Sequence, residues 1–482
     1  MPLQLATGIA NWLRTRQSAE SGRVVDSVHL VAGTYADGFA ALVFSLLGWA
    51  QPQALALKVS LGRPAESEFD SLAQALILQL APETASVADL SEKPLYQGRS
   101  LVSNNWALFR ALTRTLRGRL VPDFSVIQKQ LPSGLFPDSP VGVATPVCYH
   151  AKICATLALL ECFRPQAVHR QALRRGLQAL LQLVSPQGVL VPYGRSRNTL
   201  FAYGSAYLAL RLGARLFDDP HCAWAAAAVL ETMKRFQDPD GHIPAALNGN
   251  EWLRKDWDIY INNPDYNAYA AACLLMAERL GAASDKGQAP GPETVDLGPL
   301  LVCRRDDGYF ACSTTGEFAP YGSPFFCDTR YAGLVPLLFD DGQTLKNFDE
   351  NYCWDGRDST RTALVDPRIS DWIAYLELNH QLHWVRLYGA VTWILQGDVL
   401  TVSGSGLPLA CKPIPRWRRF LTSRLSHKPV PQLVHQHLSS LFETTLCCDF
   451  GQRKITSQSA FPSSRSILRR GFLEESLCPT SP

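Results

Sequence analysis

Apolar residues recur at helical spacing through most of the first 281 residues. In the segments 148–163, 169–184, 200–217 and 222–236 they stand three and four positions apart, which is typical of helices that bury one face. Two such segments follow each other closely before a loop containing glycine and proline interrupts the pattern. The first half of the chain is therefore predicted to consist of helical hairpins.

The loops between these hairpins repeat a common pattern. A turn followed by an extended, proline-bearing run occurs as LPSGLFPDSP, SPQGVLVPYG and DPDGHIPAAL, whose glycines Gly134, Gly188 and Gly241 are 54 and 53 residues apart. Hairpins of this length cannot bury their apolar faces alone and must stack or close on one another. The spacing predicts an incomplete (α/α)5-6 toroid over residues 1–282, with the three glycines on equivalent loops at one end.

The pattern changes after residue 282, so that the fold class is mainly α with a β part. Residues 283–295 are rich in Gly, Pro and Ala without an apolar period, as in a linker. Residues 296–410 contain many Val, Tyr, Trp and Thr in near-alternation and predict an antiparallel β domain. Residues 411–482 show neither pattern and carry 11 Lys or Arg against 4 Asp or Glu, from which we expect a basic, poorly ordered tail.

Composition excludes several classes of function. With 46% hydrophobic and 18% charged residues the chain is globular, and 35 basic against 39 acidic residues before position 411 leave no broad basic surface for nucleic acid. The most apolar window, 38–59, is broken by Gln51, Pro52 and Gln53, so it predicts core helices rather than a membrane span. The N-terminus lacks a signal-peptide pattern, from which we expect a cytoplasmic protein without a membrane partner.

The 13 cysteines are scattered, without a CxxC pair or a Cys/His cluster at the spacing of metal ligands. Their odd number and the helical positions of Cys148, Cys154 and Cys273 favour reduced, buried thiols. We therefore expect neither a metal nor another cofactor.

Several loop motifs at the starts of predicted helices combine polar and aromatic residues. They are SNNWALFR (Ser103–Arg110), FPDSPVGVATPVCYHAK (Phe136–Lys152), YGRSRNTLFAY (Tyr193–Tyr203) and DWDIYINNPDYNAY (Asp256–Tyr269). In order and residue type they resemble the groove-lining motifs of polysaccharide lyases of the heparinase II/III, chondroitinase and alginate lyase type, and of related uncharacterised toroid proteins. The resemblance covers about residues 90–410, and it implies a toroid, a β domain and an anionic oligo- or polysaccharide substrate.

Such a lyase needs a defined set of groups. Cleavage of a uronic-acid polymer by β-elimination removes the proton on C5 and protonates the departing O4, after the neighbouring carboxylate has been neutralised. Asn or Arg suits the carboxylate, and Tyr or His suits the proton transfers. The expected catalytic residues are Tyr149, His150, Tyr260 and Tyr266. The expected substrate-binding residues are Asn104, Asn105, Tyr193, Arg195, Arg197, Asn198 and Trp257.

These motifs also have ordinary structural interpretations. His150, at a helix start, could simply bond the preceding loop. An asparagine at 104 or 105 could cap the helix that follows, as could Ser196 or Asn198 in the next motif. Asp265 could cap the last helix of the toroid.

Two other functions stay open. An inverting glycoside hydrolase on the same toroid would use paired carboxylates, Asp138 with Asp256 or Asp258. A non-catalytic toroid would only bind glycan. The arginines Arg195 and Arg197 favour the lyase, because a hydrolase of neutral sugars has less use for a cationic loop.

Overall fold

The chain divides into a helical unit and a β unit in the computed structural model. The helical unit is Met1–Pro140, Thr145–Val191 and Ser196–Pro290, and the β unit is Val141–Ala144, Pro192–Arg195 and Gly291–Pro482. The boundary at residue 290 falls inside the predicted linker 283–295. The structure describes residues 1–26, 35–52, 54–56, 67–84, 103–119, 125–138, 145–194, 196–247, 263–281, 287–306, 308–313, 317–318, 326–328, 335–340, 342–343, 345–347, 362–364, 373–378, 381–388, 391–396, 399–413, 442–449 and 454–459.

The helical unit alternates long helices with loops, as the apolar period predicts. Its helices are α1 (Pro2–Arg16), α2 (Ala36–Leu46), α4 (Glu68–Leu80), α6 (Asn104–Leu116), α7 (Ser125–Gln128), α8 (Val147–Phe163), α9 (Ala167–Gln182), α10 (Leu200–Phe217), α11 (Pro220–Arg235) and α13 (Asn263–Leu280), with a short 3-10 helix at Pro82–Thr84. No helix in the described part of the chain has both the length and the apolar character that crossing a membrane would require.

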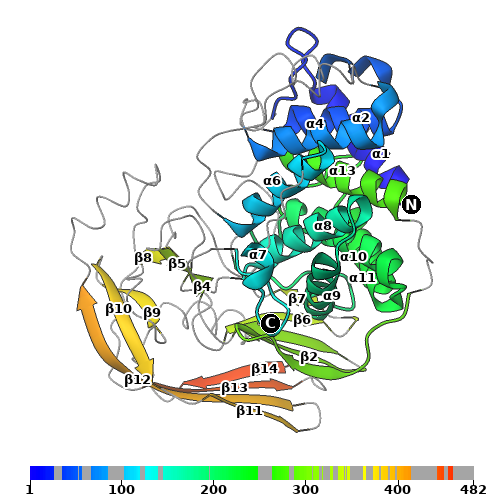
Figure 1. Cartoon of the computed structure of the whole chain (residues 1–482). Helices are drawn as coiled ribbons and strands as arrows, with labels where there is room; N and C mark the ends of the chain where they lie inside the picture. Colours follow the sequence, from blue (N-terminus) through cyan, green and yellow to red (C-terminus); the bar gives the residue numbers. More distant parts are fainter. Residues whose placement is uncertain are drawn as a thin grey trace. The chain divides into compact units, whose positions relative to one another are not determined.

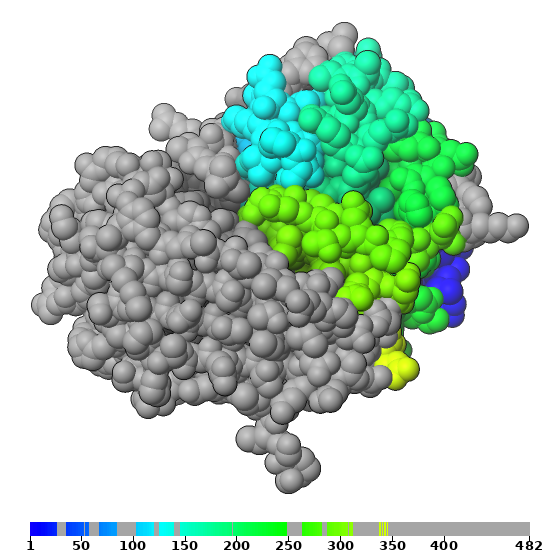
Figure 2. Space-filling view, turned by 90° about the horizontal axis from the view of Figure 1, so that it is seen from below, coloured from blue at the N-terminus to red at the C-terminus, as the bar shows by residue number. Residues whose placement is uncertain are grey.

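An inner ring of helices forms the core of this unit (Figure 1). Helices α2, α4, α6, α8, α10 and α13 each pack against the next, and α13 returns to pack against α2. Helix α1 lies outside α13 and α2, α9 outside α8 and α10, and α11 outside α10. Figure 2 shows this unit from another side, where the cyan to green surface belongs to the part of the chain that contains α6 to α11. The predicted α/α toroid is confirmed, and the described inner helices contact one another all the way round the ring.

The ring closes through two buried aspartates that cap each other's helices. Asp265, in the first turn of α13, accepts hydrogen bonds from the backbone N–H groups of Tyr35 at 3.0 Å and Ala36 at 2.7 Å, where α2 begins. Asp26, ahead of α2, accepts one from Asn263 at 2.9 Å, where α13 begins. Asp265 therefore caps the first inner helix, whereas the sequence suggested it as a cap of the last one.

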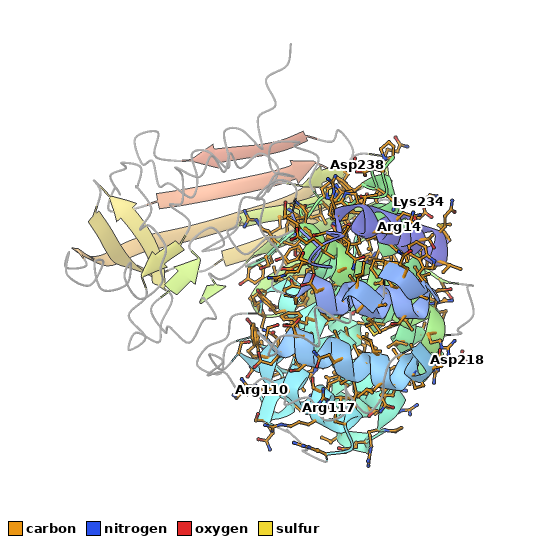
Figure 3. The ribbon with its side chains drawn as sticks, turned by 90° about the horizontal axis from the view of Figure 1, so that it is seen from above. Arg14, Arg110, Arg117, Asp218, Lys234 and Asp238 are labelled. Atoms are coloured by element: carbon orange, nitrogen blue, oxygen red, sulfur yellow. The ribbon has the colours of Figure 1, made fainter. Side chains whose placement is uncertain are left out.

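The three repeated turns have one geometry. In each, the glycine N–H donates to the carbonyl three residues earlier at 2.9 Å. Gly134, Gly188 and Gly241 have φ angles of +90°, +80° and +93°, a region that other residues rarely adopt. Each turn precedes an inner helix, and Figure 3 labels Asp238 of the third turn. The predicted equivalence of the three loops is confirmed.

Each turn glycine also lies against the backbone of the next outer helix. A Cβ atom on any of them would collide with a main-chain carbonyl oxygen. The oxygens concerned belong to Arg175 in α9, Ala228 in α11 and Gly8 in α1. The repeat is therefore a packing unit, in which a turn without a side chain lets one hairpin dock on its neighbour, and α1 takes the place of the last outer helix.

The β unit consists of antiparallel strands, as predicted. One sheet has the order β1-β2-β3-β6-β7, another β14-β13-β12-β10-β9 with β11 also on β12, and a third β4-β5-β8. The strands are β1 (Glu293–Asp296), β2 (Leu300–Arg304), β3 (Tyr309–Ser313), β4 (Glu317–Phe318), β5 (Phe326–Asp328), β6 (Val335–Asp340), β7 (Leu345–Asn347), β8 (Thr362–Leu364), β9 (Ile373–Leu378), β10 (Gln381–Tyr388), β11 (Val391–Gln396), β12 (Val399–Pro413), β13 (Phe442–Asp449) and β14 (Lys454–Ser459).

The region expected to be a tail without strands contributes to the second sheet. Strand β12 runs through the expected boundary at residue 410, β13 pairs with β12, and β14 pairs with β13. The sequence of β14, KITSQS, has a single strongly apolar residue, so the alternation that marks a half-buried strand is nearly absent from it. Pairing with a neighbouring strand, which the local pattern does not encode, forms this part of the sheet.

Replacing Gly188 by alanine should destabilise the protein far more than replacing Gly118. Both glycines have positive φ, +80° and +72°, so both substitutions carry a backbone cost of about 1–2 kcal/mol. Only at Gly188 does the new methyl group meet another helix, since nothing lies within 4 Å of the Cβ position of Gly118. We expect Gly188→Ala to lower the unfolding free energy by about 3 kcal/mol or more in chemical denaturation. Equal losses would contradict the docking role.

Candidate functional site

The starts of the inner helices converge around one ring, Phe69 at the beginning of α4. Aromatic rings from α2, α6, α10 and α13 surround it. The centroid distances to Phe69 are 4.3 Å for Tyr35, 5.8 Å for Trp106, 5.0 Å for Phe109, 5.9 Å for Phe201 and 6.2 Å for Tyr269. Tyr35, Phe69, Trp106 and Phe201 lie at or just before the first turns of their helices, and Phe109 and Tyr269 lie in the second turns. This part of the ring is therefore where distant parts of the sequence meet.

A lysine from α8 reaches the centre of this aromatic group. The ammonium of Lys152 lies 3.9 Å from the ring centroid of Phe109, 4.3 Å from Phe69, 5.4 Å from Phe201 and 5.8 Å from Trp106. We call these four rings the aromatic collar. Their faces attract a cation, which offsets part of the cost of burying one. The side chain is 1% exposed.

Lys152 also anchors a buried polar network. Its Nζ donates to Oδ1 of Asn105 at 2.7 Å, and Nδ2 of Asn105 donates to Asp138 and, at 2.9 Å, to Ser103. We call Asn105, Asp138 and Lys152 the polar triad, and each member is buried. The sequence interpretation missed Lys152, although a lysine followed by the apolar run ICATLALL was a usable signal.

The paired asparagines both hold the segment that ends the first repeated loop. The backbone N–H of Asn104 donates to the backbone carbonyl of Asp138 at 2.8 Å. Its side-chain amide donates to the backbone carbonyl of Pro137 at 2.6 Å. The N-cap position of α6 is taken by Ser103, whose side chain makes no capping bond. Neither asparagine is therefore the cap considered from the sequence, and the carboxylate that Asn105 holds is the protein's own Asp138.

The loop of the YGRSRN motif carries unusual backbone. Ser196 and Asn198 both have φ of +57°, and the third non-glycine residue with positive φ among those described, Asp218, simply ends α10. The hydroxyl of Tyr149, in the first turn of α8, lies 3.2 Å from Oγ of Ser196. Non-glycine residues with left-handed backbone cost about 1–2 kcal/mol and persist where the surroundings hold them.

Other residues of this motif are buried rather than exposed to solvent. Tyr193, Arg197 and Asn198 are all at most 4% accessible, and the N-cap position of α10 is taken by Thr199 rather than by Ser196 or Asn198. The carbonyl of Asn198 accepts the N–H of Leu247 at 2.6 Å, which ties the loop to the segment after the third turn.

Four phenols gather near the same helix starts. The pKa of Tyr35 is raised well above its ordinary value, first by burial, then by the charge of Asp265 and by the neighbouring Tyr266, Tyr269 and Tyr149. Tyr266 is buried, with its ring 5.7 Å from Phe201. Of the expected proton-transfer residues, the structure therefore brings Tyr149 and Tyr266 to this end of the ring.

His150 does not have the environment of a catalytic base. It has no exposed surface, its Nδ1 accepts the backbone N–H of Phe136 at 3.2 Å, and its Nε2 donates to the carbonyl of Gly176 at 3.0 Å. Burial lowers its pKa to about 4 despite the opposing effect of the Gly176 bond. The expected catalytic role is corrected to the structural one, because both ring nitrogens already hold the loop and α9.

The repeat shows why a polar side chain is needed at the position of His150. The N–H two residues after each turn glycine is bonded to a side chain of the following inner helix. The other two pairs are Leu190 with the Tyr203 hydroxyl at 3.2 Å and Ile243 with Oδ1 of Asn267 at 3.0 Å. His150, Tyr203 and Asn267 therefore serve one purpose with three different chemistries.

Five of the expected site residues lie outside the described residues. They are Arg195, Asp256, Trp257, Asp258 and Tyr260. The pairing of Asp138 with Asp256 or Asp258 and the binding roles of Arg195 and Trp257 therefore stay predictions.

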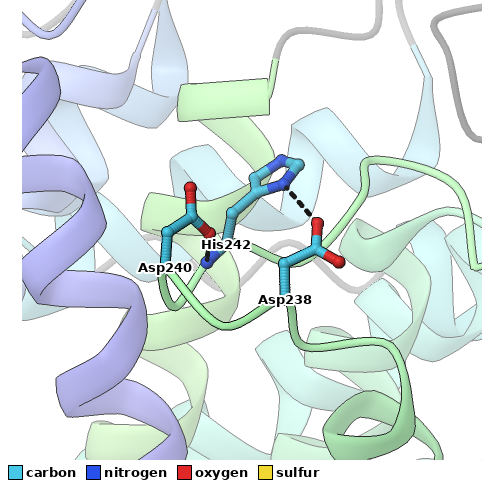
Figure 4. Close-up of side chains that lie close together, drawn as sticks. All are labelled: Asp238, Asp240 and His242. Atoms are coloured by element: carbon cyan, nitrogen blue, oxygen red, sulfur yellow. Dashed lines mark hydrogen bonds and ion pairs between the residues drawn. The ribbon is translucent and has the colours of Figure 1, made fainter.

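The third turn brings Asp238, Asp240 and His242 together (Figure 4), with potential ligand atoms within 4.8 Å of one another. Their bonds belong to the turn. His242 bonds Asp238 through Nδ1 and Asn263 through Nε2, both at 3.3 Å, and its backbone N–H donates to Asp240 at 3.0 Å. The histidine ring also packs on Trp12 of α1 at 4.7 Å, so this cluster joins the turn to α1 and α13.

Comparison with known proteins gives weak structural neighbours. No family model matches the sequence, and no curated protein matches it. A possible member of the GH105 family from Salmonella enterica serovar Paratyphi A has a TM-score of 0.39 and 13% identity, covering 56% of this chain and 92% of that one. The type II terpene cyclase MstE from Scytonema has a TM-score of 0.40 and 15% identity, covering 58% of this chain and 98% of that one. A mutant of heparan sulfate lyase HepC from Pedobacter heparinus has a TM-score of 0.33 and 9% identity, covering 77% of this chain and 54% of that one. Similarity at this level carries no argument about the reaction of this chain.

The low pKa of His150 predicts a stability that falls in mild acid. The unfolded chain binds a proton near pH 6.5 and the folded protein near pH 4, so stability is full above about 6.5 and decreases as the pH falls toward about 4, by up to about 3 kcal/mol. His150→Gln, which can still donate and accept without titrating, should flatten this part of the curve. Urea unfolding at several pH values measures it, and an unchanged slope in the variant would contradict the assignment.

Proposed function

We propose that the helical unit is the catalytic domain of a polysaccharide lyase, which cleaves a uronic-acid-containing glycan by β-elimination at the N-terminal end of the inner ring. The observation that carries the proposal is the contact between the Tyr149 hydroxyl and Ser196, whose backbone is left-handed. A strained loop that fixes one phenol oxygen is the kind of feature found at reactive sites.

The charge distribution at this end of the ring supports an anionic substrate. Six inner helices begin here, and the N-terminus of a helix carries a partial positive charge. Lys152 adds a full charge at the centre of the aromatic collar. The carboxylates Asp26, Asp138 and Asp265 lie at the same end, and each already accepts hydrogen bonds from N–H groups of the protein. The helix starts and Lys152 are therefore the groups that would attract a sugar carboxylate.

Tyr149 can carry both proton transfers of the reaction. As a phenolate it removes the C5 proton, the electron pair forms the C4–C5 double bond, and the C4–O4 bond breaks. The phenol so formed then protonates the departing O4, which restores the phenolate. Ser196 holds the phenol oxygen in place, and Tyr266 supplies a second phenol near the same helix starts. Arg195 stays the proposed partner of the uronate carboxylate, together with Arg197 and Asn198 from the same loop.

Asp138 favours a second candidate function. A buried carboxylate at the reactive end of an α/α toroid suits the acid of an inverting glycoside hydrolase, with Asp256 or Asp258 as the proposed base. The two reactions differ in their products. The lyase makes a 4,5-unsaturated uronate that absorbs in the near ultraviolet, and the hydrolase makes reducing ends without that absorbance.

A panel of anionic polysaccharides should therefore yield an ultraviolet-absorbing product with the full chain. Tyr149→Phe should lower kcat at least about 100-fold, because it removes the transferred proton and leaves the ring in place. The matched control is Tyr203→Phe on α10, which loses its bond to Leu190 and should lower the melting temperature while turnover per folded molecule is kept.

The alternatives give other outcomes of the same assay. The hydrolase would be supported if the protein makes reducing ends without ultraviolet absorbance, and if this activity is lost in Asp138→Asn and kept in Tyr149→Phe. Binding of a polysaccharide without any product would leave a non-catalytic glycan-binding toroid.

A further inference from the structure

Lys152 takes no part in the proton transfers of the proposed reaction. It follows Tyr149 by three positions on α8, so both side chains leave the same face of the helix. A cation that is 1% exposed costs several kcal/mol unless its surroundings compensate for the lost water. A methionine would fill the aromatic collar without that cost, so packing alone does not explain a lysine here.

The ammonium determines how the Asn105 amide is oriented. An ammonium can only donate hydrogen bonds, so the atom of Asn105 that lies 2.7 Å from Nζ must be the amide oxygen. The amide nitrogen then points the other way, where its two N–H groups meet Ser103 and Asp138. An asparagine is suited to this position because it presents an acceptor to a cation at one end and donors to a carboxylate at the other.

The position of Asp138 is fixed in two separate ways. Its backbone carbonyl is held by the N–H of Asn104, and the preceding carbonyl of Pro137 by the Asn104 side chain. Its carboxylate is held by Asn105. Asn105 thus contributes to the direction of the carboxylate, and Lys152 contributes to the direction of the amide.

We propose that Lys152 is a positioning residue: acting through Asn105, its ammonium fixes the Asp138 carboxylate in the orientation that accepts hydroxyl groups of the bound sugar. The inference rests on the proposed function, since it takes the N-terminal end of the ring to be where the glycan binds. Lys152 itself does not touch the substrate. Charge-assisted hydrogen bonds to a carboxylate are about twice as strong as neutral ones, so a carboxylate in the wrong direction weakens substrate binding.

Lys152→Met tests the orientation directly. In full-length protein labelled with ¹⁵N-asparagine, the side-chain NH₂ signal of Asn105, assigned by its loss in Asn105→Leu, should exchange slowly in the native protein and at least about 10-fold faster in Lys152→Met. The same variant should lower kcat/KM on the cleaved polysaccharide about 10- to 100-fold. The double variant with Asn105→Leu should be no worse than the stronger single one, because both remove the same link.

Two further variants keep the test decisive. Lys152→Met/Asp138→Asn removes both charges, so it should fold even if the single variant does not. Its kcat/KM should be no lower than that of Asp138→Asn alone, because Lys152 acts only through that carboxylate. Arg174→Met is the control, because it removes a cation 4.9 Å from the Phe217 ring at the other end of the unit and should change neither readout.

The outcomes separate the two proposals. A native-like amide signal and unchanged kcat/KM in Lys152→Met, or losses that add in the double variant, would overturn the positioning role. Absence of turnover by the unmodified protein on every polysaccharide would overturn the proposed function instead, and the amide exchange rates would still decide whether Lys152 orients Asn105.

Discussion

The helical unit depends on the contact that closes its inner ring. Helices α2 and α13 meet at the closure. Asp265 of α13 caps the start of α2, and Asp26, which precedes α2, caps the start of α13. Buried carboxylates are stable there because each accepts backbone N–H groups at the positive end of a helix. The residues joined lie more than 200 positions apart, as in the pair Ala36 and Asp265 with a separation of 229. Without closure, the six helix starts would not surround Phe69.

The repeated turns explain how the rest of the ring is built. A glycine with positive φ lets each turn reach the next outer helix, and a polar residue of the following inner helix holds the loop behind it. Histidine, tyrosine and asparagine all meet this second need, because a single acceptor is enough. His150 thus has the structural role that Tyr203 and Asn267 have in the other two repeats. Candidate reactive residues are those that differ from the repeat.

Lys152 is such a departure. Two positions after His150, Tyr203 and Asn267, the inner helices carry Lys152, Ser205 and Tyr269, and the serine and tyrosine bond each other at 3.1 Å. In their place α8 has a cation within the aromatic collar and a link to Asn105 and Asp138. Lys152 therefore occupies a structural position of the repeat, three residues after Tyr149, whose hydroxyl contacts Ser196.

The sequence by itself determined the local elements and their repetition. Apolar spacing gave the helical hairpins, the spacing of Gly134, Gly188 and Gly241 gave the toroid, and clustered polar motifs marked the helix starts, because these properties are encoded within one turn or one hairpin. The closure by Asp26 and Asp265, the strands beyond residue 411 and the burial of His150 and Lys152 were decided by tertiary structure. Local patterns show that a residue is polar and near a helix start, but whether it meets solvent, a backbone group or a buried cation depends on partners far away in the chain.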